Sequence, residues 1–272
     1  MTVEVFAPAK INLTLHVTGQ RDDGYHLLDS YVVFADVGDD LTVTLAEDMA
    51  LTVSGPFAAG VPTDARNLCW RVAELWGVTA HIHLVKNLPP AAGIGGGSSD
   101  AAAVIKALEA LTGRPAPFDP MLLGADVPVC MVGHAARMQG IGEYVLPLFQ
   151  EPDFAVLVNP RVEVPTPQVF ARLAQKANAP MTPWPEGGGK AAALAWLKAQ
   201  RNDLQAPAIA VAPVIGEVLA ALKGCEGARM TRMSGSGATC FAVFETLAAA
   251  EKAATRLAWE RPDWWVRASI LR

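Results

Sequence analysis

The 272-residue sequence has few charged residues and no long apolar run, and each shortage excludes a class of protein. Charged residues make up 18% of the chain, and 22 basic against 27 acidic residues leave a net charge of −5, so a broadly cationic nucleic-acid-binding surface is not expected. The apolar stretch 206–216 contains two prolines and is shorter than the roughly 18 residues that a membrane span needs. We therefore expect a soluble protein that binds neither nucleic acid nor a membrane.

The sequence also lacks a secretory signal and any paired-cysteine motif. Glu4, Pro8 and Lys10 interrupt the apolar residues at the N-terminus, so a cytoplasmic location is expected. No two of the four cysteines have the spacing of a CxxC pair or a zinc site, which favours buried, reduced thiols. His81 and His83 would point to one face of a strand and could share a metal, but no third ligand follows nearby, and a solvated strand face is the favoured interpretation.

The order of strand-like and helix-like segments predicts an α+β protein of two domains, in line with about 150 residues per domain. A shift in composition at residues 147–153 places the boundary between domains 1–150 and 151–272. Residues 41–45 and 51–53 both alternate with period two across a short connection, which indicates a hairpin. A helix is expected over residues 65–76 and a strand over 81–86.

Glycine occupies four of the five positions 93–97, between this strand and a predicted helix that begins near Ser98. Glycines let successive backbone N–H groups converge, and a helix N-terminus adds partial positive charge, so the pattern is typical of a polyphosphate site. Ser98 or Ser99 is expected to cap the helix, and a hydroxyl there could also reach a phosphate or its Mg²⁺. From glycine content alone, a flexible turn with a serine cap is an equal alternative.

Two common phosphate loops do not fit these residues. A Walker A loop needs Lys and then Ser or Thr after its last glycine, whereas Ser98 follows Gly97 and the next lysine is Lys106. In a dinucleotide-binding fingerprint counted from Gly93, the third glycine would fall on Ser98. A third kind of phosphate loop is required.

The segment Pro89-x-x-x-Gly-Ile-Gly-Gly-Gly-Ser-Ser99 resembles the second motif of the GHMP kinase superfamily of small-molecule kinases. Residues 7–13, Ala-Pro-Ala-Lys-Ile-Asn-Leu, are similar to the first motif of that family, and residues 234–238, Ser-Gly-Ser-Gly-Ala, to the third. Ala91 and Ala92 stand where relatives often have glycine. Further segments resemble the branch of the family that acts on a cytidine diphosphate alcohol, and they are residues 7–15, 21–26, 123–128, 140–143 and 201–204.

The resemblance implies a two-domain GHMP kinase fold, with an N-terminal half like domain 2 of ribosomal protein S5, a ferredoxin-like C-terminal half and the active site in the cleft. It also implies ATP-dependent phosphorylation of the C2 hydroxyl of a cytidine diphosphate-linked methylerythritol, which gives the 2-phosphate and ADP in the non-mevalonate isoprenoid precursor pathway. ATP would be the co-substrate and Mg²⁺ would accompany its phosphates.

Lys10 and Asp126 match the catalytic lysine and aspartate of the family. Asp126 lies among apolar residues in Leu-Gly-Ala-Asp-Val-Pro, and Lys10 is the one charged residue of the stretch 5–17. The residues alone favour a buried ion pair without chemistry. The resemblance implies instead that Asp126 takes or orients the hydroxyl proton, while Lys10 holds both groups in line and stabilises charge.

The other site residues follow from the same resemblance. Tyr25 offers a flat face to cytosine, although it could simply pack a turn, and Trp184 is expected to close the other face of the ring. Asp100 and Glu143 are the acidic candidates for Mg²⁺, whose ligands are otherwise unknown. The residues expected to bind ATP are Asn67, at the adenine pocket, and Pro89, Pro90, Ala91, Ala92, Gly93, Ile94, Gly95, Gly96, Gly97, Ser98 and Ser99. The residues expected to bind the acceptor are Asn12, Tyr25, His26, Trp184, Gly235 and Gly237.

Two other functions remain open at this stage. A GHMP kinase acting on homoserine or a mevalonate-like alcohol would not need the segment Gly24-Tyr-His26, which suits a nucleobase. A non-catalytic nucleotide-binding protein on the same fold would not need both Lys10 and Asp126. The expected partners are small molecules, and the expected assembly is a monomer or a weak homodimer.

Overall fold

The computed structural model describes residues 1–148, 151–185 and 187–272, and the chain divides into two compact units. Unit 1 comprises residues 1–10, 37–90 and 95–133, and unit 2 comprises residues 11–36, 91–94 and 134–272. The units do not follow a single cut in the sequence, because strands β1 (Thr2–Asn12) and β3 (His26–Leu45) each begin in one unit and end in the other. The division into domains 1–150 and 151–272 stays a prediction, and residues 149 and 150 at its boundary lie outside the described residues.

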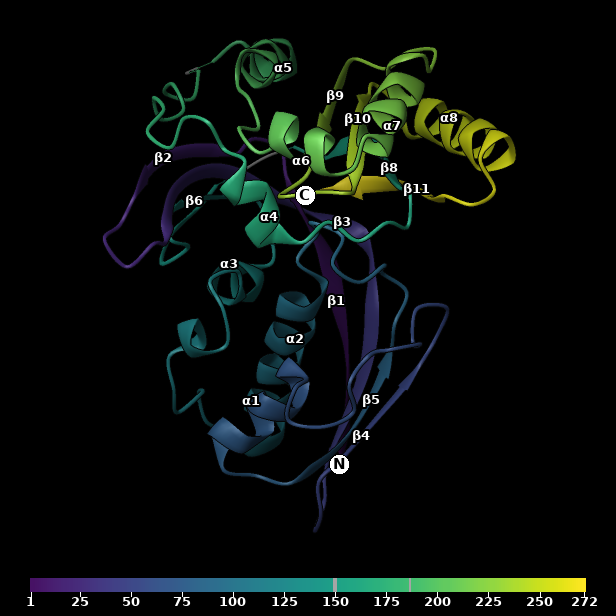
Figure 1. Cartoon of the computed structure of the whole chain (residues 1–272). Helices are drawn as coiled ribbons and strands as arrows, with labels where there is room; N and C mark the ends of the chain where they lie inside the picture. The colour runs from purple at the N-terminus through teal and green to yellow at the C-terminus, as the bar shows by residue number, and fades with distance from the viewer. Residues whose placement is uncertain (149–150, 186) are drawn as a thin grey trace. The chain divides into compact units, whose positions relative to one another are not determined.

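Unit 1 packs helices beside a sheet whose strands alternate buried and accessible residues. β5 (Ala80–Val85) buries Ala80, Ile82 and Leu84 and pairs antiparallel with β3 and parallel with β4 (Ala50–Ser54). α1 packs against α2, and Figure 1 shows the two helices side by side. The helices of this unit are α1 (Leu68–Trp76), α2 (Gly96–Thr112), α3 (Val127–Val132) and the short 3₁₀ turn Pro120–Leu122.

The hairpin expected between residues 41–45 and 51–53 is wrong. β5 lies between the two segments, so that the sheet order is β4-β5-β3 and β4 never pairs with its neighbour in sequence. β5 buries one whole face and, in the central position, pairs with a strand on each side. This arrangement is more stable than a local hairpin between β3 and β4 would be. The expected helix over 65–76 begins three residues later, at Leu68.

Unit 2 contains a ferredoxin-like arrangement of four antiparallel strands in the order β11-β8-β10-β9, with α7 between β8 and β9 in sequence and α8 between β10 and β11. Figure 1 shows α7 and α8 beside these strands. This confirms the α+β class and the ferredoxin-like C-terminal half. The elements are β8 (Asp153–Asn159), α7 (Val214–Lys223), β9 (Met230–Met233), β10 (Cys240–Phe244), α8 (Leu247–Glu260) and β11 (Trp265–Leu271).

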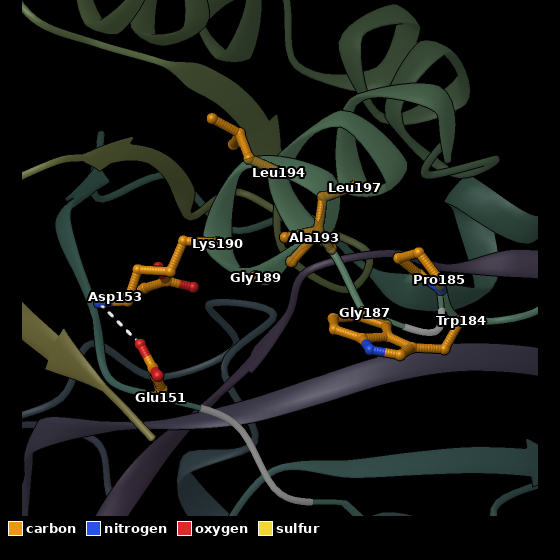
Figure 2. A pocket seen from close by; sticks show the side chains of 10 residues that line it. All are labelled: Glu151, Asp153, Trp184, Pro185, Gly187, Gly189, Lys190, Ala193, Leu194 and Leu197. Atoms are coloured by element: carbon orange, nitrogen blue, oxygen red, sulfur yellow. Dashed lines mark ion pairs between the residues drawn. The ribbon is translucent and has the colours of Figure 1, made fainter.

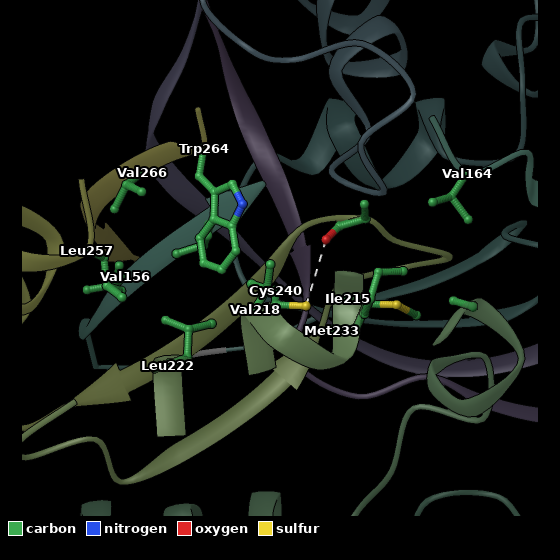
Figure 3. Packing of buried hydrophobic residues seen from close by; sticks show 14 of the residues in the cluster. Val156, Val164, Ile215, Val218, Leu222, Met233, Cys240, Leu257, Trp264 and Val266 are labelled. Atoms are coloured by element: carbon green, nitrogen blue, oxygen red, sulfur yellow. Dashed lines mark hydrogen bonds between the residues drawn. The ribbon is translucent and has the colours of Figure 1, made fainter. Parts of the chain in front are cut away.

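The core of unit 2 lies between α7, α8 and the sheet. Figure 3 shows Val218 and Leu222 of α7 near Val156 of β8 and Leu257 of α8, all fully buried. Smaller strands and helices complete the unit. They are β2 (His16–Gln20), β6 (Ala136–Gly140), β7 (Tyr144–Pro147), α4 (Thr166–Ala171), α5 (Gly189–Ala199) and α6 (Gln205–Val211).

All four cysteines, Cys69, Cys130, Cys225 and Cys240, are buried and unpaired, as expected from their spacing. Burial raises the pKa of the thiols of Cys69, Cys130 and Cys240. Across the described ranges, none of the helices is both long enough and apolar enough to span a bilayer.

Candidate active site

Lys10 and Asp126 form an ion pair within unit 1. Lys10 lies on β1, and its Nζ is 2.7 Å from Oδ2 of Asp126, which directly precedes α3. The lysine side chain is 5% exposed, whereas the aspartate side chain is 35% exposed. A buried cation therefore holds a carboxylate that can still meet a ligand. The structure brings the two residues together as expected, and their catalytic roles stay a prediction.

The glycine loop leads directly into helix α2, whose N-terminal residue is Gly96. Gly95 precedes the helix in a left-handed conformation with φ of 64°, and no side chain caps this helix end. The serine cap expected from the sequence is therefore wrong, because the helix begins ahead of both serines, and Ser99 Oγ donates to the carbonyl of Pro8, at 2.7 Å. The first amides of α2 are left to bind an anion.

Two glycines of this loop lie against two different lysines of unit 1. A Cβ at Gly95 would be 3.1 Å from the Cβ of Lys10, and a Cβ at Gly96 would be 3.2 Å from the Nζ of Lys86. A side chain at either position would therefore make a tight contact with a lysine, and at Gly95 the positive φ also favours glycine.

Beneath Gly96, Lys86 bridges two buried carboxylates. Its Nζ is 2.5 Å from Asp39 Oδ2 and 2.6 Å from Asp100 Oδ2. Burial raises the pKa of Asp100 to about 7, against the opposing effect of the Lys86 ammonium. Both carboxylates raise the pKa of Lys86 despite its own burial.

The two acidic candidates for Mg²⁺ are both engaged elsewhere. Asp100 is directed to Lys86, and Oε2 of the exposed Glu143 accepts from the backbone amide of Ile141, at 2.5 Å, within its own turn. Among the described residues, no group of three His, Cys, Asp or Glu side chains could hold a metal ion. His81 and His83 do not share a ligand, since His81 contacts Asp48 while His83 contacts hydroxyl groups of β4.

Asn67 has a structural role as the N-cap of α1. Its Oδ1 accepts from the amide of Cys69, at 2.9 Å, and its Nδ2 donates to the carbonyl of Pro62, at 2.8 Å. Both ends of its side-chain amide are therefore used within the protein, and its place in an adenine pocket stays a prediction.

In unit 2, residues of the three family motifs meet at Asn12, Gly93 and Ser234. The backbone amide of Asn12 donates to Ser234 Oγ, at 3.0 Å, and this hydroxyl donates to the carbonyl of Gly93, at 2.9 Å. A Cβ at Gly93 would be 2.6 Å from the carbonyl oxygen of Ser234, and one at Gly235 would be 2.7 Å from that of Gly93. Gly237 also lines this contact, because its backbone nitrogen would be 2.8 Å from a Cβ at Gly93.

The side chain of Asn12 leaves one acceptor unused. Its Nδ2 donates to Ser30 Oγ, at 2.8 Å, whereas its buried Oδ1 has no hydrogen-bond partner among the described residues. A buried carbonyl oxygen without a partner costs free energy unless a ligand supplies a donor.

Tyr25 and His26 lie at the end of the β2–β3 turn, and Tyr25 is 59% exposed. The ring of His26 stacks on Phe170 of α4, with centroids 4.5 Å apart and planes 15° from parallel. Burial, followed by the charge of Lys176, lowers the pKa of His26. The structure therefore presents a tyrosine, a neutral imidazole and a phenylalanine ring in this region of unit 2.

Trp184, the aromatic residue expected at the cytosine site, has other ring partners. Its centroid is 5.1 Å from that of Tyr31 and 4.9 Å from that of Trp196. Figure 2 shows Trp184 lining a pocket with Leu197 and Lys190, where Lys190 forms an ion pair with Glu151. Sequence reasoning missed Phe170, because nothing in the spacing of a residue so distant in the chain marks it as a neighbour of His26.

Comparison with known proteins agrees with this arrangement. The model of the GHMP kinases N terminal domain matches residues 65–134, and that of the GHMP kinases C terminal matches residues 188–260. The chain is 57% identical to 4-diphosphocytidyl-2-C-methyl-D-erythritol kinase of Dinoroseobacter shibae, over 98% of this chain and 94% of the relative. It is 52% identical to the kinase of the same name from Paracoccus denitrificans, over 97% and 95% of the two chains.

Solved structures give the same result. A crystal structure of 4-(cytidine 5'-diphospho)-2C-methyl-D-erythritol kinase is 33% identical, with a TM-score of 0.79 and 99% of each chain covered. Homoserine kinase from Cytophaga hutchinsonii is 17% identical with a TM-score of 0.68, a likeness of fold alone. The chain belongs to the 4-diphosphocytidyl-2-C-methyl-D-erythritol kinase family of the GHMP kinases.

Proposed function

We propose that this protein transfers the γ-phosphoryl group of ATP to the C2 hydroxyl of 4-diphosphocytidyl-2-C-methyl-D-erythritol, in the non-mevalonate route to isoprenoid precursors. The observation that carries the catalytic part is the 2.7 Å pair between buried Lys10 and partly exposed Asp126. The identity of 57% to a kinase named for this substrate supports the choice of acceptor.

In the proposed reaction, Asp126 accepts the proton of the C2 hydroxyl as the hydroxyl oxygen bonds to the γ-phosphorus. The bond from that phosphorus to the β–γ bridging oxygen breaks, and ADP leaves with its electron pair. The Lys10 ammonium keeps the Asp126 carboxylate oriented and stabilises negative charge as it develops on the phosphoryl oxygens.

The phosphates of ATP would bind to the glycine loop, residues 89–99. The uncapped N-terminus of α2 supplies backbone N–H donors and partial positive charge for the β and γ phosphates. Mg²⁺ would enter with ATP, held by phosphate oxygens and water, as suits an ion that keeps much of its hydration shell. That mode of binding fits the lack of a three-carboxylate cluster in the described part of the chain.

The acceptor would be recognised by residues of unit 2. Tyr25 would stack on cytosine, and Phe170 would take the second aromatic position in place of Trp184, since it already lies against His26. The unused Oδ1 of Asn12 would accept a hydrogen bond from a hydroxyl of the acceptor. Gly235 and Gly237 would keep the third motif close enough to Gly93 to shape this site.

An assay of ADP release, run with the cytidine diphosphate alcohol, homoserine and mevalonate side by side, tests this function. Turnover with the cytidine compound and none with the smaller alcohols is expected. Turnover with only homoserine or mevalonate would assign another GHMP activity, and no turnover with any acceptor would favour a nucleotide-binding protein without catalysis. We also propose that the enzyme acts in the cytoplasm. We propose further that it is a monomer or weak homodimer, and sedimentation equilibrium can test this assembly.

A further inference from the structure

A buried charged cluster lies under the glycine loop and has no part in the phosphoryl transfer described above. Lys86, Asp39 and Asp100 are 4%, 0% and 3% exposed. Taking such groups out of water is costly even when they are paired, and formally the cluster carries two negative charges against one positive. Because burial raises the pKa of Asp100 to about 7, the cluster carries at most one net negative charge near neutral pH. It has no net positive charge, so electrostatic attraction to phosphates does not explain its position.

One side of the cluster fixes the point where the chain leaves strand β5. Asp39 Oδ1 accepts from the backbone amides of Asn87, at 2.6 Å, and Leu88, at 2.8 Å, the two residues before Pro89. The backbone amide of Lys86 also donates to the carbonyl of Ser54, at 2.7 Å. Asp39 therefore holds the start of the glycine loop through its second carboxylate oxygen, while its first oxygen binds Lys86.

The other side of the cluster fixes the point where helix α2 begins. Asp100 lies in the first turns of α2, and its Oδ2 binds Lys86 Nζ at 2.6 Å. Gly96 lies close to the same ammonium group, since a Cβ at this position would be 3.2 Å from Lys86 Nζ. Lys86 is thus bonded to a carboxylate at each end of the loop.

We propose that Lys86, Asp39 and Asp100 form an ionic clamp that sets the separation of the two ends of the glycine loop and so positions its backbone amides for the phosphates of ATP. The clamp residues are positioning residues and touch no reacting atom. The ammonium of Lys86 is occupied by two carboxylates, so it does not serve as a phosphate ligand of the Walker type. This inference rests on the proposed function, because it takes ATP as the ligand of the loop.

Kinetics of Asp100→Asn and Lys86→Met test the clamp. Asp100→Asn keeps the size of the side chain and weakens the link to α2, whereas Lys86→Met removes both links. We expect the KM for ATP to rise about tenfold or more in each folded variant, because small displacements of binding groups have effects of this order. The kcat at saturating ATP and the KM for the cytidine alcohol should change less than about threefold.

The matched control is Asp29→Asn, which removes a buried carboxylate of unit 2 bound to Arg137 and to the amide of Met181. This variant should lower the melting temperature without changing the KM for ATP. If the clamp variants lose thermal stability as the control does and keep a KM for ATP within twofold of wild type, the clamp is only structural and the inference is wrong.

Hydrogen–deuterium exchange of peptides covering residues 87–100 separates this inference from the proposed function, because it needs no ATP. Both clamp variants should exchange these amides faster than wild type and than Asp29→Asn. Unchanged exchange would overturn the clamp, even in an active kinase. Faster exchange in a protein that phosphorylates none of the acceptors would support the clamp and refute the proposed function.

Discussion

At the scale of single residues, the difference in exposure between Lys10 and Asp126 assigns them different tasks. The lysine side chain is buried, whereas the carboxylate retains an accessible face. Asp126→Asn keeps the shape of the side chain and removes its ability to accept a proton. We expect turnover to fall by about 10²-fold or more, the usual range for loss of a general base, while ATP binding persists.

Isothermal titration with ATP, together with the ADP-release assay, checks this prediction. Thr246→Ala is a useful comparison, because it removes the cap of α8 and should cost about 1 kcal/mol of stability without abolishing turnover. Turnover by Asp126→Asn at the wild-type rate would remove Asp126 from the mechanism.

His16 makes stability depend on pH. It is 1% exposed, its Nε2 accepts from the amide of Arg201 and its Nδ1 faces the carbonyl of Ala179, so the ring is neutral with its proton on Nδ1. Burial, and then the charge of Arg201, lowers its pKa. The pKa of His16 in the folded protein lies below its unfolded value of about 6.5. The stability that the neutral His16 ring contributes is therefore fully present above a pH of about 6.5, and it is lost as the pH falls toward the folded pKa.

Urea unfolding at pH 7 and pH 5 measures this effect. From pH 7 to pH 5, the free energy of unfolding should fall more in wild type than in His16→Gln, whose side chain cannot take up a proton. The exposed His134 provides the control, since His134→Gln should keep the wild-type pH dependence. Equal losses in wild type and His16→Gln would show that His16 does not cause the decline.

At the scale of elements, the contact between the glycine loop and the third motif leaves no room for a side chain. A Cβ at Gly93 would meet three backbone atoms at 2.6–2.8 Å, while its φ is +71°. Gly113, after α2, has a φ of +68° but no atom within 4 Å of the corresponding Cβ. Gly93→Ala should therefore lower the free energy of unfolding by more than about 3 kcal/mol. Gly113→Ala should lower it by only about 1 kcal/mol, the conformational cost of alanine at this φ. Chemical denaturation of both variants makes the comparison, and equal losses would contradict it.

The same elements show which features of the fold and the site could be predicted from the sequence alone. The glycine loop and the helix after it were predictable, because the motif spacing carries the information locally. The Lys10–Asp126 pair, whose members are distant in the chain, was predictable because each lies in a segment that resembles a motif of a known family. The clamp was not, because Asp39 lies 47 residues from Lys86 and carries no motif. The serine cap was wrongly predicted because α2 begins at Gly96, ahead of both serines, and the hydroxyl of Ser99 has a tertiary partner in Pro8.

At the scale of the whole molecule, the interleaved units make an experiment on fragments informative. Residues 151–272 lack the part of unit 2 contributed by residues 11–36, including the pairing of Leu271 with Ala35. They also lack Leu13, whose carbonyl accepts a hydrogen bond from the buried guanidinium of Arg232, at 2.7 Å. We expect this fragment alone to unfold without a cooperative transition, and coexpression with residues 1–150 to restore one.

Circular dichroism on heating, for the fragment and for the coexpressed pair, is the measurement. A sharp transition of residues 151–272 alone, near the melting temperature of the full chain, would favour independent domains divided at residue 150. Failure of the pair to associate would show that the chain connection itself is needed.

The burial of all four thiols has a practical consequence for spectroscopy of this enzyme. Thiol reagents attack the thiolate, and at Cys69, Cys130 and Cys240 burial disfavours that form as well as limiting access. The native protein should therefore resist maleimide labelling without any cysteine being replaced. A single cysteine introduced at Trp259, which is 84% exposed on α8, would then carry a fluorophore or spin label at one defined position.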